Sequence, residues 1–362
     1  MGHDQPSAPD ARVAAAAAHW GHRFTANGTD YGDFTATLAR IGQWADWCRE
    51  WGVTASRYEQ LAEAAEDAGQ QETADGAWRR ASLAWHWGKF VFVDDPVQQR
   101  AAAERSVACY RRAAAGLTPP AELVHIPYQA TTLAGYLRIP AAPGRAAAPP
   151  VVIMVPGLDS TKEELQATAE YLLARGMATL AIDGPGQGEA AYDLPIEPAY
   201  EKVAAAVVDY LATRADVDGG TVGLFGISLG GYYAARAAAR EKRLRAVVDL
   251  AGPYRFDLDW DELPAQTRAT FRVRSGAASD AEARAMAAAL TLEEAAGEIT
   301  TPLLVLGGGR DGITPAYHQE RLVSEVATAE LLFYPDGSHG VTNRAYESRS
   351  RLADWLAARL HG

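Results

Sequence analysis

Residues 222–231 read Val-Gly-Leu-Phe-Gly-Ile-Ser-Leu-Gly-Gly, an apolar run that ends in the pattern Gly-x-Ser-x-Gly around Ser228. The stretch that follows, 232–240, has a helical composition. A strand that turns sharply into a helix needs small residues two positions on either side of the turning residue, and Gly226 and Gly230 meet that steric demand. The segment therefore predicts a strand–turn–helix unit that raises the Ser228 hydroxyl above the end of a sheet.

Short apolar runs with helical stretches between them surround this segment. Such runs predict the strands of a parallel sheet with helices on both faces, so the expected fold class is α/β. Ahead of them, two segments of alternating polarity predict an antiparallel hairpin. The apolar runs are 151–155, 178–182, 222–225, 246–250, 302–306 and 331–334, and the hairpin segments are 122–128 and 132–139.

An acid and a base follow the serine in the chain order Ser, Asp, His. Asp311 lies in a glycine-rich loop after the fifth apolar run, and His339 lies in a small-residue loop after the last one. A serine hydroxyl is a weak nucleophile near neutral pH and needs a base that a third group orients. We predict that Ser228, Asp311 and His339 form a catalytic triad. Asp249, at the end of the strand after the nucleophile, and Asp336, in the loop of His339, are weaker alternatives for the acid.

Two backbone N–H groups are candidates to bind the oxyanion of a tetrahedral intermediate. One belongs to Leu229, the residue after the nucleophile, and the other to Leu158, in the loop after the first apolar run. The glycine-rich segment 182–189 resembles a dinucleotide-binding loop, but it contains a proline and lacks the Gly-x-Gly-x-x-Gly spacing at a first strand–helix turn. We interpret it as the bend after a strand at the rim of the cleft.

The N-terminal third differs in composition from the rest. It holds seven of the nine tryptophans and has few strand-like runs. Trp44, Trp47 and Trp51 recur at the spacing of one helix face, which is more typical of a core than of a substrate platform. Asp-Asp-Pro at 94–96 predicts a helix start. These features predict a domain made of several helices.

The chain is therefore expected to have two domains. The first, 1–120, is an all-helical cap that contributes to the substrate cleft, and the second, 121–362, is the catalytic domain. An Ala/Pro/Gly stretch over 141–150 predicts a linker. The helical segment around 253–298 is longer than a normal connection between strands, so we expect an insertion that contributes to a lid.

Composition excludes several classes of function. The 362 residues include 34 Lys and Arg against 46 Asp and Glu, a formal net charge of −12, which argues against nucleic acid or an anionic membrane as a partner. No apolar run approaches the ~18 residues that a membrane span needs, and no signal peptide is recognised. The two cysteines, Cys48 and Cys109, exclude a disulfide scaffold. We expect a cytoplasmic protein without a metal or other cofactor.

Several strings of residues resemble a known group. They are Asp-Tyr-Gly-Asp-Phe at 30–34, Lys-Phe-Val-Phe-Val-Asp-Asp-Pro at 89–96, Gly-Leu-Asp-Ser-Thr-Lys-Glu-Glu at 157–164, Asp-Gly-Pro-Gly-Gln-Gly-Glu at 183–189 and Gly-Ile-Ser-Leu-Gly-Gly at 226–231. The sheet-forming part resembles the α/β-hydrolase superfamily. Nearly the whole chain is similar to the family of 2,6-dihydroxypseudooxynicotine hydrolase and the fungal polyketide chain-shortening hydrolases.

This resemblance implies an α/β-hydrolase fold with an N-terminal helical domain, a homodimer, and a substrate bound between the two domains. It also implies a Ser/Asp/His triad that hydrolyses a carbon–carbon bond next to a carbonyl, with other members acting on esters. An additional carboxylate is implied in the segment 257–262, for which Glu262 is our candidate.

The leading hypothesis is a serine hydrolase for a small carbonyl compound with an aromatic or polyketide-like body. The triad alone does not choose between retro-Claisen cleavage of a C–C bond and hydrolysis of an ester, so a carboxylesterase stays open. An acyltransferase or cyclase, and a ligand-binding homologue without activity, are the remaining alternatives. Tyr232, just past the nucleophile, and His86, between two tryptophans, are further candidates for substrate contacts.

Overall fold

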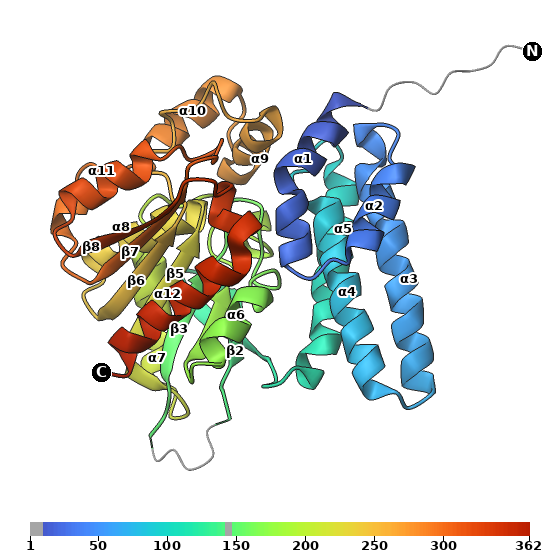
Figure 1. Cartoon of the computed structure of the whole chain (residues 1–362), viewed down its shortest axis with the longest axis horizontal. Helices are drawn as coiled ribbons and strands as arrows, with labels where there is room; N and C mark the ends of the chain where they lie inside the picture. Colours follow the sequence, from blue (N-terminus) through green and yellow to red (C-terminus); the bar gives the residue numbers. More distant parts are fainter. Residues whose placement is uncertain (1–9, 142–146) are drawn as a thin grey trace, which may run out of the picture. The chain divides into compact units, whose positions relative to one another are not determined.

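The computed structural model describes residues 10–141 and 147–362. The chain folds as two compact units, a helical unit up to Ala113 and a sheet unit from Ala114 onward (Figure 1). The division lies a few residues before the predicted boundary at 120. Most of the predicted linker, 142–146, lies outside the described residues.

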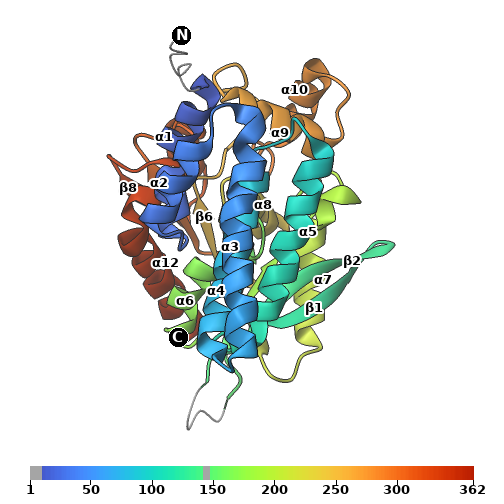
Figure 2. The ribbon, with the colours of Figure 1, turned by 90° about the vertical axis from the view of Figure 1, so that its right-hand side faces the viewer.

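The helical unit consists of five α-helices and one 3-10 turn within its described residues. Figure 2 shows the three long helices of this unit running alongside one another. Asp95 caps the last helix, because its carboxylate accepts hydrogen bonds from the N–H groups of Val97 and Gln98. The elements are α1 (Ala11–Ala26), α2 (Tyr31–Arg40), η1 (Trp44–Asp46), α3 (Trp47–Asp67), α4 (Gln71–Lys89) and α5 (Pro96–Ala113).

Tryptophan side chains form the core of the helical unit. Trp47 and Trp51 lie on α3 and are fully buried, as expected. Trp44 is also buried, but it stands in η1, a 3-10 element with a capping box formed by Gln43 and Asp46, and α3 begins only at Trp47. Burial of these large rings removes much apolar surface from water and so stabilises this unit.

The sheet unit contains one sheet of eight strands in the order β1-β2-β4-β3-β5-β6-β7-β8. The first two strands form the predicted antiparallel hairpin, β2 pairs antiparallel to β4, and all other pairs are parallel. The predicted, mostly parallel sheet is confirmed. The strands are β1 (Glu122–Tyr128), β2 (Thr131–Arg138), β3 (Pro150–Val155), β4 (Ala178–Ile182), β5 (Asp218–Ile227), β6 (Leu244–Leu250), β7 (Leu303–Gly308) and β8 (Ala329–Tyr334).

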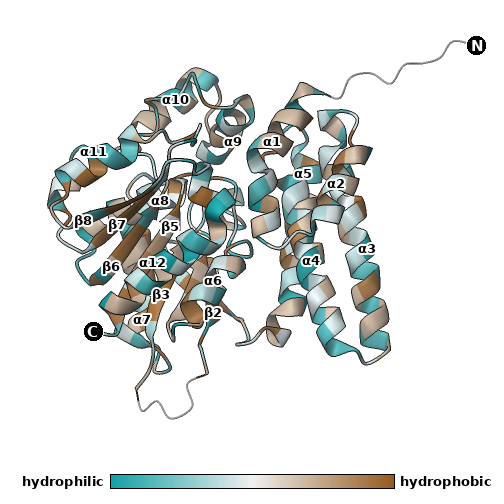
Figure 3. Cartoon of the chain, in the orientation of Figure 1, coloured by the Kyte–Doolittle hydropathy of each residue, from teal (hydrophilic) through white to brown (hydrophobic). Residues whose placement is uncertain are grey.

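Helices cover both faces of the sheet. Apolar side chains of α6 (Gln166–Leu173) and α12 (Ala345–Leu360) join those of β3, β5, β6 and β7 in one core, while α7 (Glu201–Ala212) and α8 (Leu229–Arg240) lie on the other face (Figure 1). α11 (Tyr317–Glu325) packs against β7 and β8. Figure 3 shows that the central strands are almost entirely hydrophobic, as expected for a sheet buried on both sides.

The segment between β6 and β7 is a folded insertion. It contains α9 (Ala265–Ser275), α10 (Asp280–Ala288) and η4 (Ala296–Glu298), and α9 packs against α10. The Phe271 ring lies 4.7 Å from Phe256 and 5.5 Å from Trp260, centroid to centroid, so the insertion has an aromatic core of its own. Its expected role as a lid stays a prediction.

Two short 3-10 elements, η2 (Ala114–Gly116) and η3 (Ala190–Tyr192), complete the connections before β1 and after β4. Across residues 10–141 and 147–362, no helix has the length and apolar character to cross a lipid bilayer.

Candidate active site

Ser228 occupies a sharp turn between β5 and α8. Its backbone has φ +59° and ψ −122°, a conformation that is strained for a residue with a side chain. A Cβ atom on Gly226 would lie 1.9 Å from the Gly230 carbonyl oxygen, and one on Gly230 would lie 2.4 Å from the Val155 carbonyl oxygen. Only glycine fits at both positions, which is the reason that the sequence pattern around Ser228 is so restricted.

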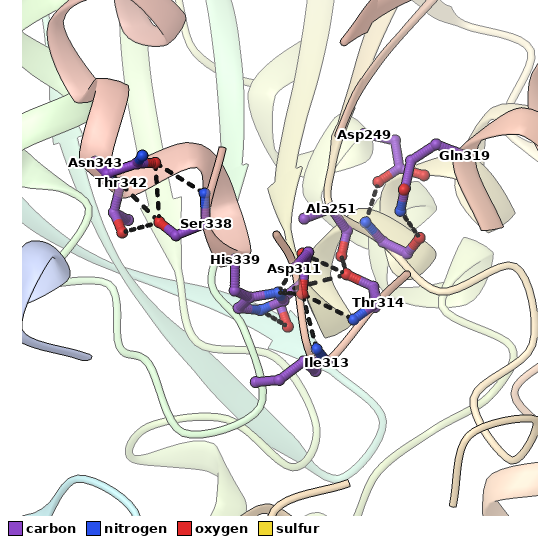
Figure 4. Close-up of polar contacts among 12 residues, drawn as sticks. Asp249, Ala251, Asp311, Ile313, Thr314, Gln319, Ser338, His339, Thr342 and Asn343 are labelled. Atoms are coloured by element: carbon purple, nitrogen blue, oxygen red, sulfur yellow. Dashed lines mark hydrogen bonds and ion pairs between the residues drawn. The ribbon is translucent and has the colours of Figure 1, made fainter. Parts of the chain in front are cut away.

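The structure brings the three predicted triad side chains into one hydrogen-bonded chain. Nε2 of His339 lies 2.9 Å from Oγ of Ser228. Nδ1 of the same ring lies 2.8 and 3.0 Å from the two carboxylate oxygens of Asp311 (Figure 4). His339 and Asp311 are buried, whereas Ser228 is half-buried. The three residues follow the ends of β5, β7 and β8; β7 and β8 are neighbours in the sheet, and β6 lies between β5 and β7.

Asp311 is held as a carboxylate by groups on every side. Its Oδ1 accepts hydrogen bonds from the N–H groups of Ile313 and Thr314, at 2.8 and 2.9 Å, and its Oδ2 accepts one from the Thr314 hydroxyl at 2.8 Å. Burial opposes the charged form, but the His339 ring and these donors outweigh it and hold the pKa of Asp311 below its usual value.

The charge on Asp311 settles the direction of the other hydrogen bonds. An ionised carboxylate can only accept, so Nδ1 of His339 must carry the proton that it donates to Asp311. In the neutral ring Nε2 is then the acceptor, and the Ser228 hydroxyl donates to it. The imidazole is therefore ready to take the Ser228 proton.

Close backbone contacts set the relative positions of the Asp311 and His339 loops. The N–H of Gly309 donates to the Tyr334 carbonyl at 2.8 Å, and the N–H of Arg310 donates to the Gly337 carbonyl at 2.9 Å. The His339 loop is tied further at Ser338, whose N–H donates to the Asn343 side chain at 2.8 Å (Figure 4). His339 begins η5 (His339–Arg344), a kinked element that leads into α12.

The two candidate oxyanion donors lie on either side of the serine. Leu229 is the first residue of α8, where N–H groups have no partner within the helix. Leu158 follows Gly157, at which a Cβ atom would lie 3.3 Å from the Cβ of Ser228. Over residues 10–141 and 147–362, neither leucine N–H donates to a protein acceptor. Both N–H groups are thus available to a ligand beside Ser228.

Comparison with known proteins identifies the group to which this arrangement belongs. A family model described as esterase FrsA-like matches residues 32–360. The chain belongs to the FrsA-like family. In this it agrees with the resemblance predicted from the sequence strings.

The proteins similar in sequence to this FrsA-like chain include several that are named as hydrolases. The chain is 35% identical to 2,6-dihydropseudooxynicotine hydrolase of Paenarthrobacter nicotinovorans over 93% of this chain and 90% of that protein. It is 34% identical to a 20-hydroxy-prefusarin hydrolase of Gibberella moniliformis, over 62% of this chain and 57% of that protein.

Solved structures confirm the α/β-hydrolase fold of this FrsA-like chain. The crystal structure of 2,6-dihydroxy-pseudo-oxynicotine hydrolase matches with a TM-score of 0.85 and 33% identity, over 94% of this chain and 95% of that one. AbyA5 matches with a TM-score of 0.74 at 21% identity, which shows the fold alone.

The alternative acids lie in other environments. Asp336 forms an ion pair with Arg344 at 2.6 Å on the surface. Asp249 is fully buried at the end of β6, and its Oδ1 accepts a hydrogen bond from the Gly252 N–H at 2.8 Å. Burial raises the pKa of Asp249 to about 7. Nδ1 of His339 instead lies 2.8 Å from Oδ2 of Asp311.

The candidate substrate contacts are not joined to the Ser228 chain by any described hydrogen bond. Tyr232 is buried in α8, and its hydroxyl donates to the Pro198 carbonyl at 3.0 Å. Glu262 is exposed in the insertion, and His86 is buried in α4 of the helical unit. Their proposed contacts with substrate stay predictions.

In the acidic segment that contains Glu262, another carboxylate has the more specific partners. Asp259 accepts hydrogen bonds from Nε2 of His318, at 2.8 Å, and from the hydroxyl of Tyr317. Burial lowers the pKa of His318, and its Nδ1 accepts from the Tyr254 N–H at 3.1 Å. These bonds anchor the insertion to α11.

A cluster of three carboxylates encloses a lysine. Oxygen atoms of Glu163, Asp183 and Glu189 lie within 4.8 Å of one another, a spacing that could hold a metal ion. The ammonium group of Lys162 stands among them, at 2.7, 2.8 and 2.6 Å from the three carboxylates, and is fully buried. The cluster therefore has a cation of its own, supplied by the chain.

Sequence reasoning missed several residues that support the site. Thr314 is the clearest, because Asp-x-x-Thr is a pattern in which the carboxylate accepts from N–H groups two and three positions later. That local signal was present in the sequence. Lys162 and Gln187 gave no such signal, since their partners lie far along the chain.

Proposed function

We propose that this protein is a serine hydrolase that cleaves a carbon–carbon bond next to a carbonyl in a small molecule with an aromatic or polyketide-like body. The observation that carries the proposal is the chain of hydrogen bonds from Ser228 through His339 to Asp311. The likeness over nearly its full length to 2,6-dihydropseudooxynicotine hydrolase supports the choice of bond and substrate class.

In the first step Oγ of Ser228 bonds to the carbonyl carbon while its proton passes to Nε2 of His339. The positive charge that develops on the ring is stabilised by the ionised Asp311. The carbonyl oxygen becomes an oxyanion and accepts hydrogen bonds from the N–H groups of Leu229 and Leu158.

In the second step the tetrahedral intermediate collapses and the bond to the neighbouring carbon breaks. The electron pair leaves with that carbon, which takes the proton from Nε2 of His339, so the substrate needs a β-carbonyl or an electron-rich ring to accept the charge. Water then attacks the acyl group on Ser228, with His339 as base, and releases a carboxylic acid and the free hydroxyl.

A carboxylesterase is the second candidate, because the matching family model is described as an esterase. The same residues would act in the same order, and an alcohol oxygen would leave in place of carbon. The difference lies in the substrate, so matched substrates can separate the two.

The test begins with covalent labelling by a fluorophosphonate probe, which reacts with activated serines. Wild-type protein should be labelled at Ser228, and Ser228→Ala should lose both labelling and turnover. Ser348→Ala is the matched control, because this serine is buried in α12 and its hydroxyl donates to the Ala345 carbonyl of the same helix. Absence of labelling in the wild type would overturn the proposal.

The second part of the test compares 1,3-diketones with aryl esters that carry the same acyl group. Release of a carboxylic acid and a ketone from the diketones, at a higher kcat/KM than for the esters, supports C–C cleavage. Turnover of the esters alone would assign the protein as a carboxylesterase. We also infer a homodimer from the family resemblance, which sedimentation velocity tests directly.

A further inference from the structure

The segment Asp183-Gly-Pro-Gly-Gln-Gly-Glu189 follows β4 and is not explained by the proposed chemistry. Gln187 is fully buried at its centre. The side-chain nitrogen of Gln187 donates a hydrogen bond to the Pro156 carbonyl and lies 3.5 Å from the Gly157 carbonyl oxygen. Its side-chain oxygen accepts from the Gly184 N–H at 3.1 Å. Because an amide nitrogen only donates and an amide oxygen only accepts, these contacts agree on one orientation of the side chain.

We propose that Gln187 is a positioning residue that sets the direction of the N–H groups of Gly157 and Leu158 beside Ser228. The inference rests on the proposed function, since it assigns one of these N–H groups to the oxyanion. It gives the 183–189 loop a role in forming the oxyanion hole.

The geometry of the peptide unit fixes the direction of these N–H groups. In a trans peptide the N–H points opposite to the carbonyl of the preceding residue. Two consecutive carbonyls, those of Pro156 and Gly157, are turned toward Gln187, so the N–H groups of Gly157 and Leu158 are turned away from it. Successive N–H groups that face the same side form a concavity that favours an anion.

Two further observations place this concavity at the serine. A Cβ atom on Gly157 would lie 3.3 Å from Cβ and 3.8 Å from Oγ of Ser228, so the peptide runs directly past the nucleophile. Throughout the described ranges, 10–141 and 147–362, the N–H groups of Gly157 and Leu158 have no protein acceptor. Donors of this kind are expected where a ligand supplies the missing acceptor.

The loop that carries Gln187 is itself held firmly. Asp183 accepts hydrogen bonds from the backbone N–H of Lys162 at 2.8 Å, from its ammonium group at 2.8 Å, and from the Glu189 N–H at 3.2 Å. Gly188 has φ +43°, and a Cβ atom there would lie 2.0 Å from the Asp183 carboxylate. These contacts close the loop tightly around Asp183 and hold the backbone that carries Gln187 in place.

The chemistry of the side chain explains why glutamine is required. Leucine would leave the two carbonyls without a donor in a buried site, and glutamate would place a carboxylate against two carbonyl oxygens. A protonated glutamate could donate one hydrogen bond, so the defect of Gln187→Glu should lessen as the pH falls.

The test measures kcat and KM with 4-nitrophenyl acetate for wild type, Gln187→Leu and Gln187→Glu. Both variants should lower kcat by about 10- to 100-fold, the range for losing groups that orient catalytic donors, with KM changed by less than about 3-fold. An aryl trifluoromethyl ketone, which forms a charged tetrahedral adduct on the serine, should bind more weakly by the same factor. Gln187→Glu should also regain activity at low pH relative to wild type.

Tyr200→Phe is the matched control. The Tyr200 hydroxyl packs against Gly184 of the same loop, where a Cβ atom would lie 2.5 Å from it, and it has no hydrogen-bond partner among the described residues. This variant should keep wild-type kcat and wild-type inhibitor affinity. Melting midpoints of all variants distinguish loss of fold from loss of orientation.

The outcomes separate this inference from the proposed function. Folded Gln187→Leu or Gln187→Glu with wild-type kcat and wild-type affinity for the ketone would overturn the inference and leave the proposed hydrolase intact. A uniform loss at all pH values in Gln187→Glu, with inhibitor affinity unchanged, would also overturn it. If the wild type itself is neither labelled nor active, the proposed function fails and the inference fails with it.

Discussion

Replacing Asp249 by asparagine should stabilise the protein, and more so at higher pH. The carboxyl group is fully buried, its Oδ1 accepts from the Gly252 N–H at 2.8 Å, and its Oδ2 has no partner among the described residues. Asparagine has nearly the same shape and keeps an oxygen for Gly252. Its amide nitrogen adds a donor near Gln319, whose side-chain oxygen also lacks a partner and whose nitrogen donates to the Gly252 carbonyl (Figure 4).

The size of the effect follows from the two pKa values of the carboxyl group. Burial raises the pKa of Asp249 to about 7 in the folded state, against 3.8 for the free side chain. Between these values the unfolded chain binds fewer protons than the folded one, so wild-type stability falls as the pH rises. The cost is about 2 kcal/mol at about pH 5 and about 4 kcal/mol at about pH 8, and Asp249→Asn removes it.

The assay is urea unfolding of wild type and Asp249→Asn at about pH 5 and about pH 8, followed by circular dichroism. Other groups titrate equally in both proteins. The change with pH in the gap between their free energies of unfolding therefore reports on this carboxyl group alone. The variant should gain about 2–3 kcal/mol more at the higher pH than at the lower. An equal gain at both pH values, or a loss at the higher one, would refute the reasoning.

Three further outcomes can be tested. Asp311→Asn should lower kcat by about 10³- to 10⁴-fold with little change in KM, because a neutral amide no longer holds the Nδ1 proton of His339 in place. Steady-state kinetics measure this change, and a decrease in kcat of less than about tenfold would contradict the prediction. Lys162→Met should destabilise the protein by about 3–5 kcal/mol in urea unfolding, since three carboxylates then face one another without a cation, and an unchanged midpoint would speak against the role of the lysine. Burial raises the pKa of Cys48 to about 12 and that of Cys109 well above its ordinary value, so a disulfide reagent should titrate neither thiol until denaturant is added, whereupon both should react.

The sheet could be predicted closely from the sequence because its strands are continuous apolar runs. A strand buried on both faces needs apolar side chains at every position. The sharp turn at Ser228 leaves room only for glycine at 226 and 230, so this pair predicts the turn. Parallel pairing in the order β5-β6-β7-β8 places the carboxyl ends of β5, β7 and β8 at one edge of the sheet. The side chains of Ser228, Asp311 and His339 do meet there, while their catalytic roles stay predictions.

The interior of the loops could not be predicted in the same way. Gln187 contacts residues about thirty positions earlier, and Lys162 contacts Asp183, which follows the neighbouring strand β4. No periodicity in the sequence indicates such pairs. Trp44 lies outside α3 although helix spacing continues through it, because residues 44–46 form a 3-10 element with its own capping box and α3 begins at Trp47.

The uneven distribution of tryptophan has a practical consequence for spectroscopy. Seven of the nine indoles lie in the helical unit. The indole N–H of Trp47 donates to the Trp87 carbonyl at 2.9 Å, and that of Trp87 donates to the Thr29 hydroxyl at 2.7 Å. Only Trp260 and Trp355 lie in the sheet unit. Intrinsic fluorescence therefore reports mainly on the helical unit and fluorophosphonate reactivity on the sheet unit, so a single denaturation series can follow the unfolding of each unit separately.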